Sequence, residues 1–146
     1  MKIVSACLLG IKCRYNGADA LNEKVLDLGK KDILISLCPE ILGGLKRQSY
    51  EIVDGSGEDV LDRKARVVTK LGEDVTEKFI KGAEEVLKLA KLLDVKEAIL
   101  KQRSPSCGCG KIYDGTFSGR IIKGSGVTTA LLKRNGIKVT SEEDFR

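Results

Sequence analysis

Short apolar runs alternate along the chain with longer segments of helical periodicity. Four runs rich in β-branched and aliphatic residues predict buried strands, at 2–6 (KIVSA), 32–37 (DILISL), 97–101 (EAILK) and 137–141 (IKVTS). Residues 75–93 and 126–136 repeat apolar positions at helical spacing, and 21–29 predicts a short helix. Because strands alternate with helices, we expect parallel βαβ units. The predicted fold class is therefore α/β, a three-layer domain with a mainly parallel sheet, formed by residues 1–146 as a single domain.

The segment 75–93 has the clearest helical pattern. Its apolar positions fall on one face, which we expect to be buried: Phe79, Ala83, Val86, Leu87, Ala90 and Leu93. Asp74 is a suitable N-cap, and Glu77, three residues later, completes a capping-box pattern. The middle of the chain, 46–73, is weaker: YEIV and ARVVT predict small strands, and DGSGED and KLGED predict turns. The glycine-rich stretch 102–119 (QRSPSCGCGKIYDGTFSG) predicts a loop, not a core strand or helix.

The charge pattern narrows the range of partners. The chain has 26 Lys and Arg against 21 Asp and Glu, a net charge of +5, and both signs are spread along its whole length. No basic strip with interleaved aromatic residues is present, so we expect no DNA partner. No apolar segment approaches the roughly 20 residues of a membrane span, and the start MKIVSACLLG lacks a cleavage region. We expect a cytoplasmic protein with no membrane partner; its oligomeric state is left open.

Three of the five cysteines follow predicted strands. Cys7 comes after the first strand, Cys38 after the second, and Cys107 a few residues beyond the third. In an open parallel sheet the carboxyl ends of the strands share one edge, where ligands bind. We therefore expect these three thiols to converge. Cys13 and Cys109 are weaker candidates, and the odd number of cysteines argues against a complete set of disulfides.

The absence of histidine limits the chemistry available to these thiols. It excludes a histidine-paired cysteine nucleophile and any zinc site with histidine ligands. Structural zinc sites use four ligands, commonly from paired C-x2-C knuckles, which this chain lacks. Thiolates also suit iron–sulfur clusters, and a cubane held by three cysteines leaves one iron without a protein ligand. An iron–sulfur site, a thiol redox site using Cys107 and Cys109, and a non-catalytic zinc or sulfur-carrier site all stay open on spacing alone.

Several segments, in order along nearly the whole chain, closely resemble the thiouracil desulfidase family, long catalogued as a domain of unknown function. The segments are VSACLLGIKCRYNG (4–17), CPEILGGL (38–45), DVLDRKARVV (59–68), DVTEKFIKGAEE (74–85), LKQRSPSCGCGKIYDGTFSG (100–119), GVTTALLKRNGI (126–137) and SEE (141–143). The resemblance implies a Rossmann-like α/β fold and a 4Fe–4S cluster bound by three cysteines. It also implies non-redox removal of sulfur, as sulfide, from thiouracil or thiouridine monophosphate, so the expected partner is a small thiolated base or nucleotide.

The same resemblance implies roles for individual residues. Cys7 of SACLLG, Cys38 of CPE and Cys107 of SPSCG match the cluster ligands. Glu40 and Ser104 match the catalytic pair, in which a carboxylate activates water and a hydroxyl orients the water or the ring. Cys13 and Cys109 fall outside the ligand set. Substrate contacts are expected from three further polar residues: Arg14, Asn16 and Asp114.

Overall fold

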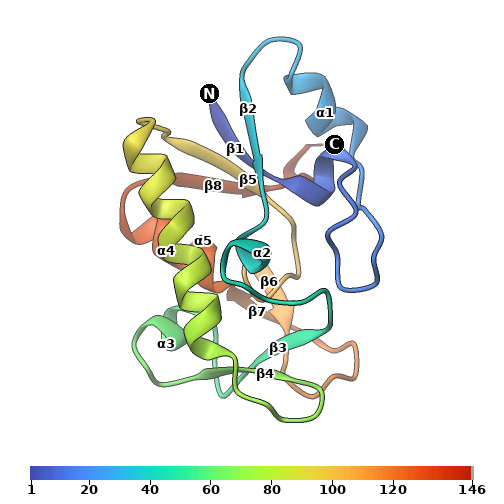
Figure 1. Ribbon diagram of the computed structural model, residues 1–146, viewed down its shortest axis with the longest axis vertical. Helices are drawn as coiled ribbons and strands as arrows, with labels where there is room; N and C mark the ends of the chain where they lie inside the picture. The colour runs from blue at the N-terminus through green and yellow to red at the C-terminus, as the bar shows by residue number, and fades with distance from the viewer. Residues whose placement is uncertain (146) are drawn as a thin grey trace.

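The computed structural model describes residues 1–145. Its central sheet has four parallel strands in the order β2-β1-β5-β8 (Figure 1). The strands are β1 (Lys2–Ser5), β2 (Leu34–Leu37), β5 (Glu97–Leu100) and β8 (Lys138–Ser141). Each lies within the apolar run that predicted it. The prediction of an α/β fold with a mainly parallel sheet is confirmed.

The sheet buries side chains on both faces, as alternate residues of a strand point to opposite sides. Ile3 packs in one apolar cluster with Val86 of the long helix, whereas its neighbour Val4 packs in another with Val25. The first face is covered by two helices, α4 (Thr76–Leu92) and α5 (Val127–Arg134). The second is covered by α1 (Glu23–Leu28) and the short 3₁₀ helix η1 (Ala6–Leu9). The result is the expected three-layer arrangement (Figure 1).

Helix α4 forms where it was predicted, but the capping prediction was wrong. The residue before the helix is Val75, and Asp74 instead accepts the N–H of Thr76 through its carboxylate at 2.9 Å. Glu77 forms an ion pair with Arg63. Leu93 was also wrongly placed on the buried face, because the helix ends at Leu92 and the side chain of Leu93 is exposed. Among residues 1–145, no helix combines the length and the apolar character needed to cross a membrane.

Two antiparallel hairpins lie beyond the carboxyl ends of the central strands (Figure 1). The first pairs β3 (Tyr50–Val53) with β4 (Arg66–Thr69), both of them predicted. Helix α3 (Gly57–Leu61) begins within the DGSGED segment (54–59), which was predicted as a turn, because Ser56 and Asp59 form a capping box there.

The second hairpin corrects the prediction of a loop over 102–119. It pairs β6 (Cys109–Tyr113) with β7 (Ile121–Ser125). The sequence lacks the apolar alternation of a buried strand here, because Ile112 is the one fully buried residue of β6 and β7. The other side chains of these two strands are half-buried or exposed. The residues before β6, including Cys107, do form a turn.

Candidate active site

Three adjacent strands of the sheet each lead into one of the cysteines. Cys7 lies in η1, directly after β1, and Cys38 follows β2 at the N-cap of helix α2 (Pro39–Leu42). Cys107 lies in the turn after β5. All three line one cavity of about 410 Å³, at the edge where the carboxyl ends of the parallel strands meet. Glu40, Ser104 and Arg14 line the same cavity.

The three strand-end thiols of this cavity, Cys7, Cys38 and Cys107, are held in their neutral form. Burial, and to a smaller extent the nearby Cys107, raises the pKa of Cys7 to about 12. Burial also raises the pKa of Cys107, to about 11, and that of Cys38. The thiols therefore ionise together only if a positively charged group compensates them, as a metal or cluster does when thiolates bind it.

The three thiols line the same cavity, but they do not converge on a position that a single metal ion could occupy. Within residues 1–145, no three Cys, Asp or Glu side chains lie close enough to hold a single metal ion. A mononuclear zinc centre requires each sulfur to be ~2.3 Å from the same atom. Three thiols around a larger space instead suit a polynuclear group whose metal atoms occupy separate corners.

The Cys107 turn is fixed by its own serine and by helix α5. The Ser104 hydroxyl oxygen accepts the N–H groups of Ser106 at 3.2 Å and Cys107 at 3.0 Å. The first N–H groups of α5 donate to carbonyl groups of the turn, and the Thr129 hydroxyl donates to the Cys107 carbonyl at 2.8 Å. The helix approaches so closely that a Cβ on Gly126 would lie 2.4 Å from the carbonyl carbon of Ser106. These contacts fix the direction of the Cys107 thiol.

A buried amide connects this turn to the neighbouring strands. Gln102 is only 6% exposed, and its side-chain oxygen accepts the N–H groups of Cys109 at 2.7 Å and Lys111 at 3.3 Å. Its side-chain nitrogen donates to the Cys109 carbonyl at 2.8 Å and to the Ser141 hydroxyl at 3.2 Å. One side chain therefore joins the start of β6 to the end of β8 across the base of the Cys107 turn.

Replacing Gln102 by alanine is expected to destabilise the protein by about 2–4 kcal/mol, because it leaves buried donors and acceptors without partners. Urea unfolding of the purified protein measures this change. The control is Asn135→Ala, which removes an exposed amide bonded to one carbonyl and should change the stability by less than about 1 kcal/mol. Equal unfolding midpoints for the two variants would contradict the role assigned to Gln102.

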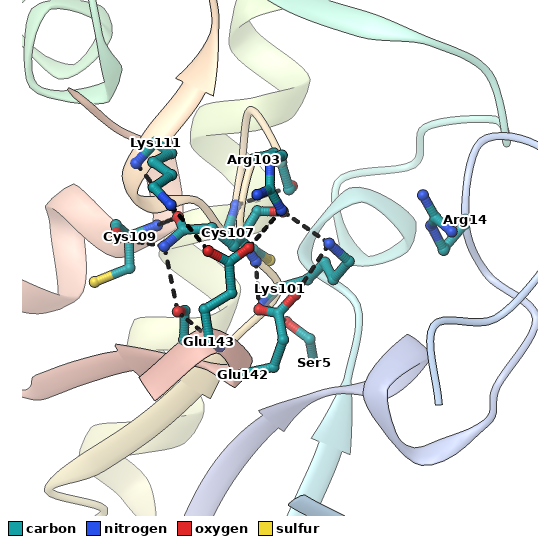
Figure 2. Close-up of polar contacts among 12 residues, drawn as sticks. Ser5, Arg14, Lys101, Arg103, Cys107, Cys109, Lys111, Glu142 and Glu143 are labelled. Atoms are coloured by element: carbon teal, nitrogen blue, oxygen red, sulfur yellow. Dashed lines mark hydrogen bonds and ion pairs between the residues drawn. The ribbon is translucent and has the colours of Figure 1, made fainter. Parts of the chain in front are cut away.

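The cationic side chains beside the Cys107 turn pair with acids near the C-terminus (Figure 2). Lys101 pairs with Glu142 at 3.0 Å, and both side chains are largely buried, at 19% and 12% exposed. Glu143 pairs with both Arg103 and Lys111. These ion pairs hold the residues that flank Cys107 and neutralise cations that would otherwise face the cavity.

Glu40 differs from these paired acids. It is half-buried in the first turn of α2, and its carboxylate has no hydrogen-bond or ion-pair partner within residues 1–145. Burial raises the pKa of Glu40 to about 7. The structure places Glu40 beside Cys38, in the wall of the thiol cavity, with its carboxyl group free to contact a bound molecule.

Of the three residues predicted to contact the substrate, one lines the cavity and two do not. Arg14 lines the cavity, and Figure 2 shows it apart from the ion pairs around Glu143. Asn16 and Asp114 do not line the cavity, because each side chain closes a local turn. Asn16 accepts the N–H of Ala18 at 3.0 Å, and Asp114 accepts the N–H and hydroxyl groups of Thr116.

The opposite wall of the cavity was missed by the sequence analysis. Tyr113 and Phe117, from the β6–β7 hairpin, line it together with Tyr50 of β3. The buried carboxylate of Glu51 accepts the N–H groups of Gly115 at 3.0 Å and Phe117 at 3.1 Å. These bonds stabilise Phe117 at a positive φ of 56°, which is uncommon for a bulky residue. The aromatic residues of YDGTFSG were the available signal, but nothing in the sequence indicated the contact with Glu51.

The two remaining cysteines have different surroundings. Cys13 is buried and lines the same cavity as the three strand-end thiols. Cys109 lies outside the cavity, and its thiol donates to the Val139 carbonyl at 3.4 Å. Figure 2 shows the Cys109 sulfur pointing away from Cys107. Of the two, only Cys13 can reach a molecule bound among the other thiols.

The fold and the site define a parallel α/β protein with a thiol-lined pocket at the carboxyl edge of its sheet. The chain belongs to the 2-thiouracil desulfurase family, whose sequence model matches residues 3–144, and the resemblance stated above is confirmed. The uncharacterized protein YbbK of Bacillus subtilis (strain 168) is 51% identical over 147 residues, covering 99% of this chain and 97% of YbbK. The solved structure of the 4Fe–4S-dependent thiouracil desulfidase TudS is 41% identical, with a TM-score of 0.84 over 98% of this chain and 91% of TudS.

Proposed function

We propose that this protein removes sulfur from a thiolated pyrimidine, as the free base or the nucleoside monophosphate, and releases it as sulfide. In this proposal Cys7, Cys38 and Cys107 bind a 4Fe–4S cluster. The observation that carries it is the shared cavity of three thiols at the ends of three adjacent strands. Membership of the 2-thiouracil desulfurase family and the similarity to TudS support the same reaction.

The residues present fit such a cluster. The donor set consists of thiols alone, two of them buried and that of Cys38 half-buried, in a chain without histidine, and their spacing is too wide for a single ion. Thiolates are the usual protein ligands of iron–sulfur clusters. When bound by three thiolates, the cluster supplies one Lewis-acidic iron that is free to take up the sulfur of a thiocarbonyl.

Glu40 is the proposed general base. A water molecule replaces the sulfur at the ring carbon, so the overall change is a thiocarbonyl plus water giving a carbonyl plus hydrogen sulfide. A base must remove a proton from that water, and the departing sulfur must later be protonated. Glu40 lies in the cavity without a competing partner, which allows its carboxylate to accept and then return this proton.

Ser104 and Arg14 are proposed to position the substrate. The Ser104 and Ser106 hydroxyl oxygens lie 3.2 Å apart, and either hydroxyl can donate to the other. When Ser106 is the donor, the Ser104 hydroxyl proton can point toward the water or the ring. Arg14 carries a guanidinium at the cavity with no carboxylate partner in residues 1–145. That group suits the phosphate of a nucleotide substrate.

The test is anaerobic reconstitution with iron and sulfide, followed by incubation with thiouracil and with thiouridine monophosphate. We expect a broad brown absorbance and equal amounts of sulfide and desulfurated product, with the protein lacking a cluster as the inactive control. A loaded protein that releases no sulfide from either compound would favour a non-catalytic iron–sulfur or sulfur-carrier protein. A protein that binds no cluster would refute the proposal.

A further inference from the structure

We propose that Cys13 is a fourth, exchangeable ligand of the cluster. In the absence of substrate its thiolate binds the iron that Cys7, Cys38 and Cys107 leave free, and the sulfur of the substrate displaces it. This inference rests on the proposed function and adds a ligand that the three-cysteine site does not include.

The burial and the packing of Cys13 support this role. Its side chain is 7% exposed, the same fraction as that of Cys7, and it lines the cavity that holds the three strand-end thiols. Cys13 packs in one apolar cluster with Cys7, and Cys38 packs against the same cluster. Its thiol has no hydrogen-bond partner within residues 1–145. Cys13 is therefore a buried, unpartnered soft donor facing the cluster site.

The cavity wall includes Cys13 but not Cys109. Cys13 lines the cavity together with Cys7 and Cys38. The Cys109 thiol instead donates to the Val139 carbonyl, outside the cavity. The two cysteines that were set aside on sequence alone thus differ in the property that decides whether a thiol can reach the cluster.

The segment that carries Cys13 allows the thiol to withdraw. Cys13 lies outside any helix or strand, in a stretch whose backbone hydrogen bonds are mostly local. The Cys13 N–H donates to Ile11 at 2.9 Å, and the N–H of Arg14 donates to Ala18 at 3.2 Å. Cys7, Cys38 and Cys107 are instead fixed by elements at the ends of central strands. Withdrawal of Cys13 therefore requires a shift of this segment and not of the elements that hold the other three thiols.

The exchange involves no change of oxidation state. The Cys13 thiol gives its proton to water when the sulfur–iron bond forms. When the substrate binds, the iron bond to Cys13 breaks, the bond to the substrate sulfur forms, and the Cys13 thiolate regains a proton from water. The thiol thus occupies the reactive iron between turnovers and limits its exposure to oxidants.

The test follows iron content and the electron paramagnetic resonance spectrum of the reconstituted protein during mild oxidation, not its activity. An iron that lacks a thiolate ligand is the one lost first, which leaves a paramagnetic three-iron cluster. We expect the wild-type protein and Cys109→Ala to keep their iron, and Cys13→Ala to lose about a quarter of it with the three-iron signal appearing. Cys109→Ala is the matched control, because it removes a thiol outside the cavity.

Cys13→Val is measured in parallel, because valine fills a similar volume without offering a donor. Cys13→Val should lose iron as Cys13→Ala does. This result would show that the iron is lost because the thiolate ligand is missing and not because the side chain packs less well. If the valine variant keeps its iron as the wild type does, or if the wild type loses iron as fast as the variants, the inference is overturned. A wild-type protein that loads no cluster would instead overturn the proposed function.

Discussion

Cys107→Ala is expected to abolish both the brown absorbance of the reconstituted protein and its release of sulfide. Cys107 is the most buried of the three proposed ligands, at 4% exposed, and its turn is fixed by Ser104 and the start of α5. No other side chain can take its place at that corner of the cavity, since Cys109 is directed toward Val139. Two strand-end thiolates and the exchangeable Cys13 then remain, and without a ligand at the Cys107 corner the cluster should not be retained. The same loss is expected for Cys7→Ala and Cys38→Ala.

The matched control is Cys109→Ala, which removes a thiol only two residues away. It should retain the absorbance and sulfide release of the wild type, within about twofold, as expected for a substitution outside the site. The measurements are iron per chain, the visible spectrum and sulfide release under anaerobic conditions. Full cluster loading in Cys107→Ala, or its loss in Cys109→Ala, would show that the ligand set has been assigned incorrectly. Thermal unfolding of the cluster-free variants identifies any that fail to fold.

Much of this site follows from features that the sequence carries directly. The β-branched and aliphatic runs predicted the four central strands, and the rule that parallel strands end at one edge then grouped Cys7, Cys38 and Cys107. Each of these cysteines is close in sequence to the strand that positions it. For that reason the prediction needed only the strand boundaries and the parallel topology, both of which the structure confirms.

The remaining features depend on contacts that the strand pattern does not show, and two of them join residues far apart in the chain. Glu51 lies more than sixty residues from Phe117, and only the folded protein brings its carboxylate to that N–H. The burial of Cys13 depends in the same way on packing against the first strand and Cys38. Asn16 and Asp114 were expected at the substrate, but short polar side chains in turns often bond to nearby backbone, as both do here.

Glu40→Gln is expected to retain the cluster and lose turnover, with kcat lowered by about 10²–10⁴-fold, the usual contribution of a general base. The substitution preserves the size of the side chain and removes its ability to carry a proton. Because Glu40 has no ion-pair partner in residues 1–145, no buried cation is left unpaired by the change. The visible spectrum and the iron content should therefore equal those of the wild type, and KM should change little. The measurement is the rate of sulfide release at saturating thiouracil.

Glu51→Gln is the matched control, since Glu51 also lines the cavity and is more deeply buried. The amide oxygen of the substituted side chain can still accept the N–H groups of Gly115 and Phe117, so the aromatic wall should persist and kcat should stay within about tenfold of the wild type. Equal losses of kcat in both variants would indicate a general electrostatic effect of the cavity. A selective loss in Glu40→Gln would identify the carboxyl group next to Cys38 as the group that transfers the proton, because both substitutions replace one carboxyl group of the same cavity by an amide.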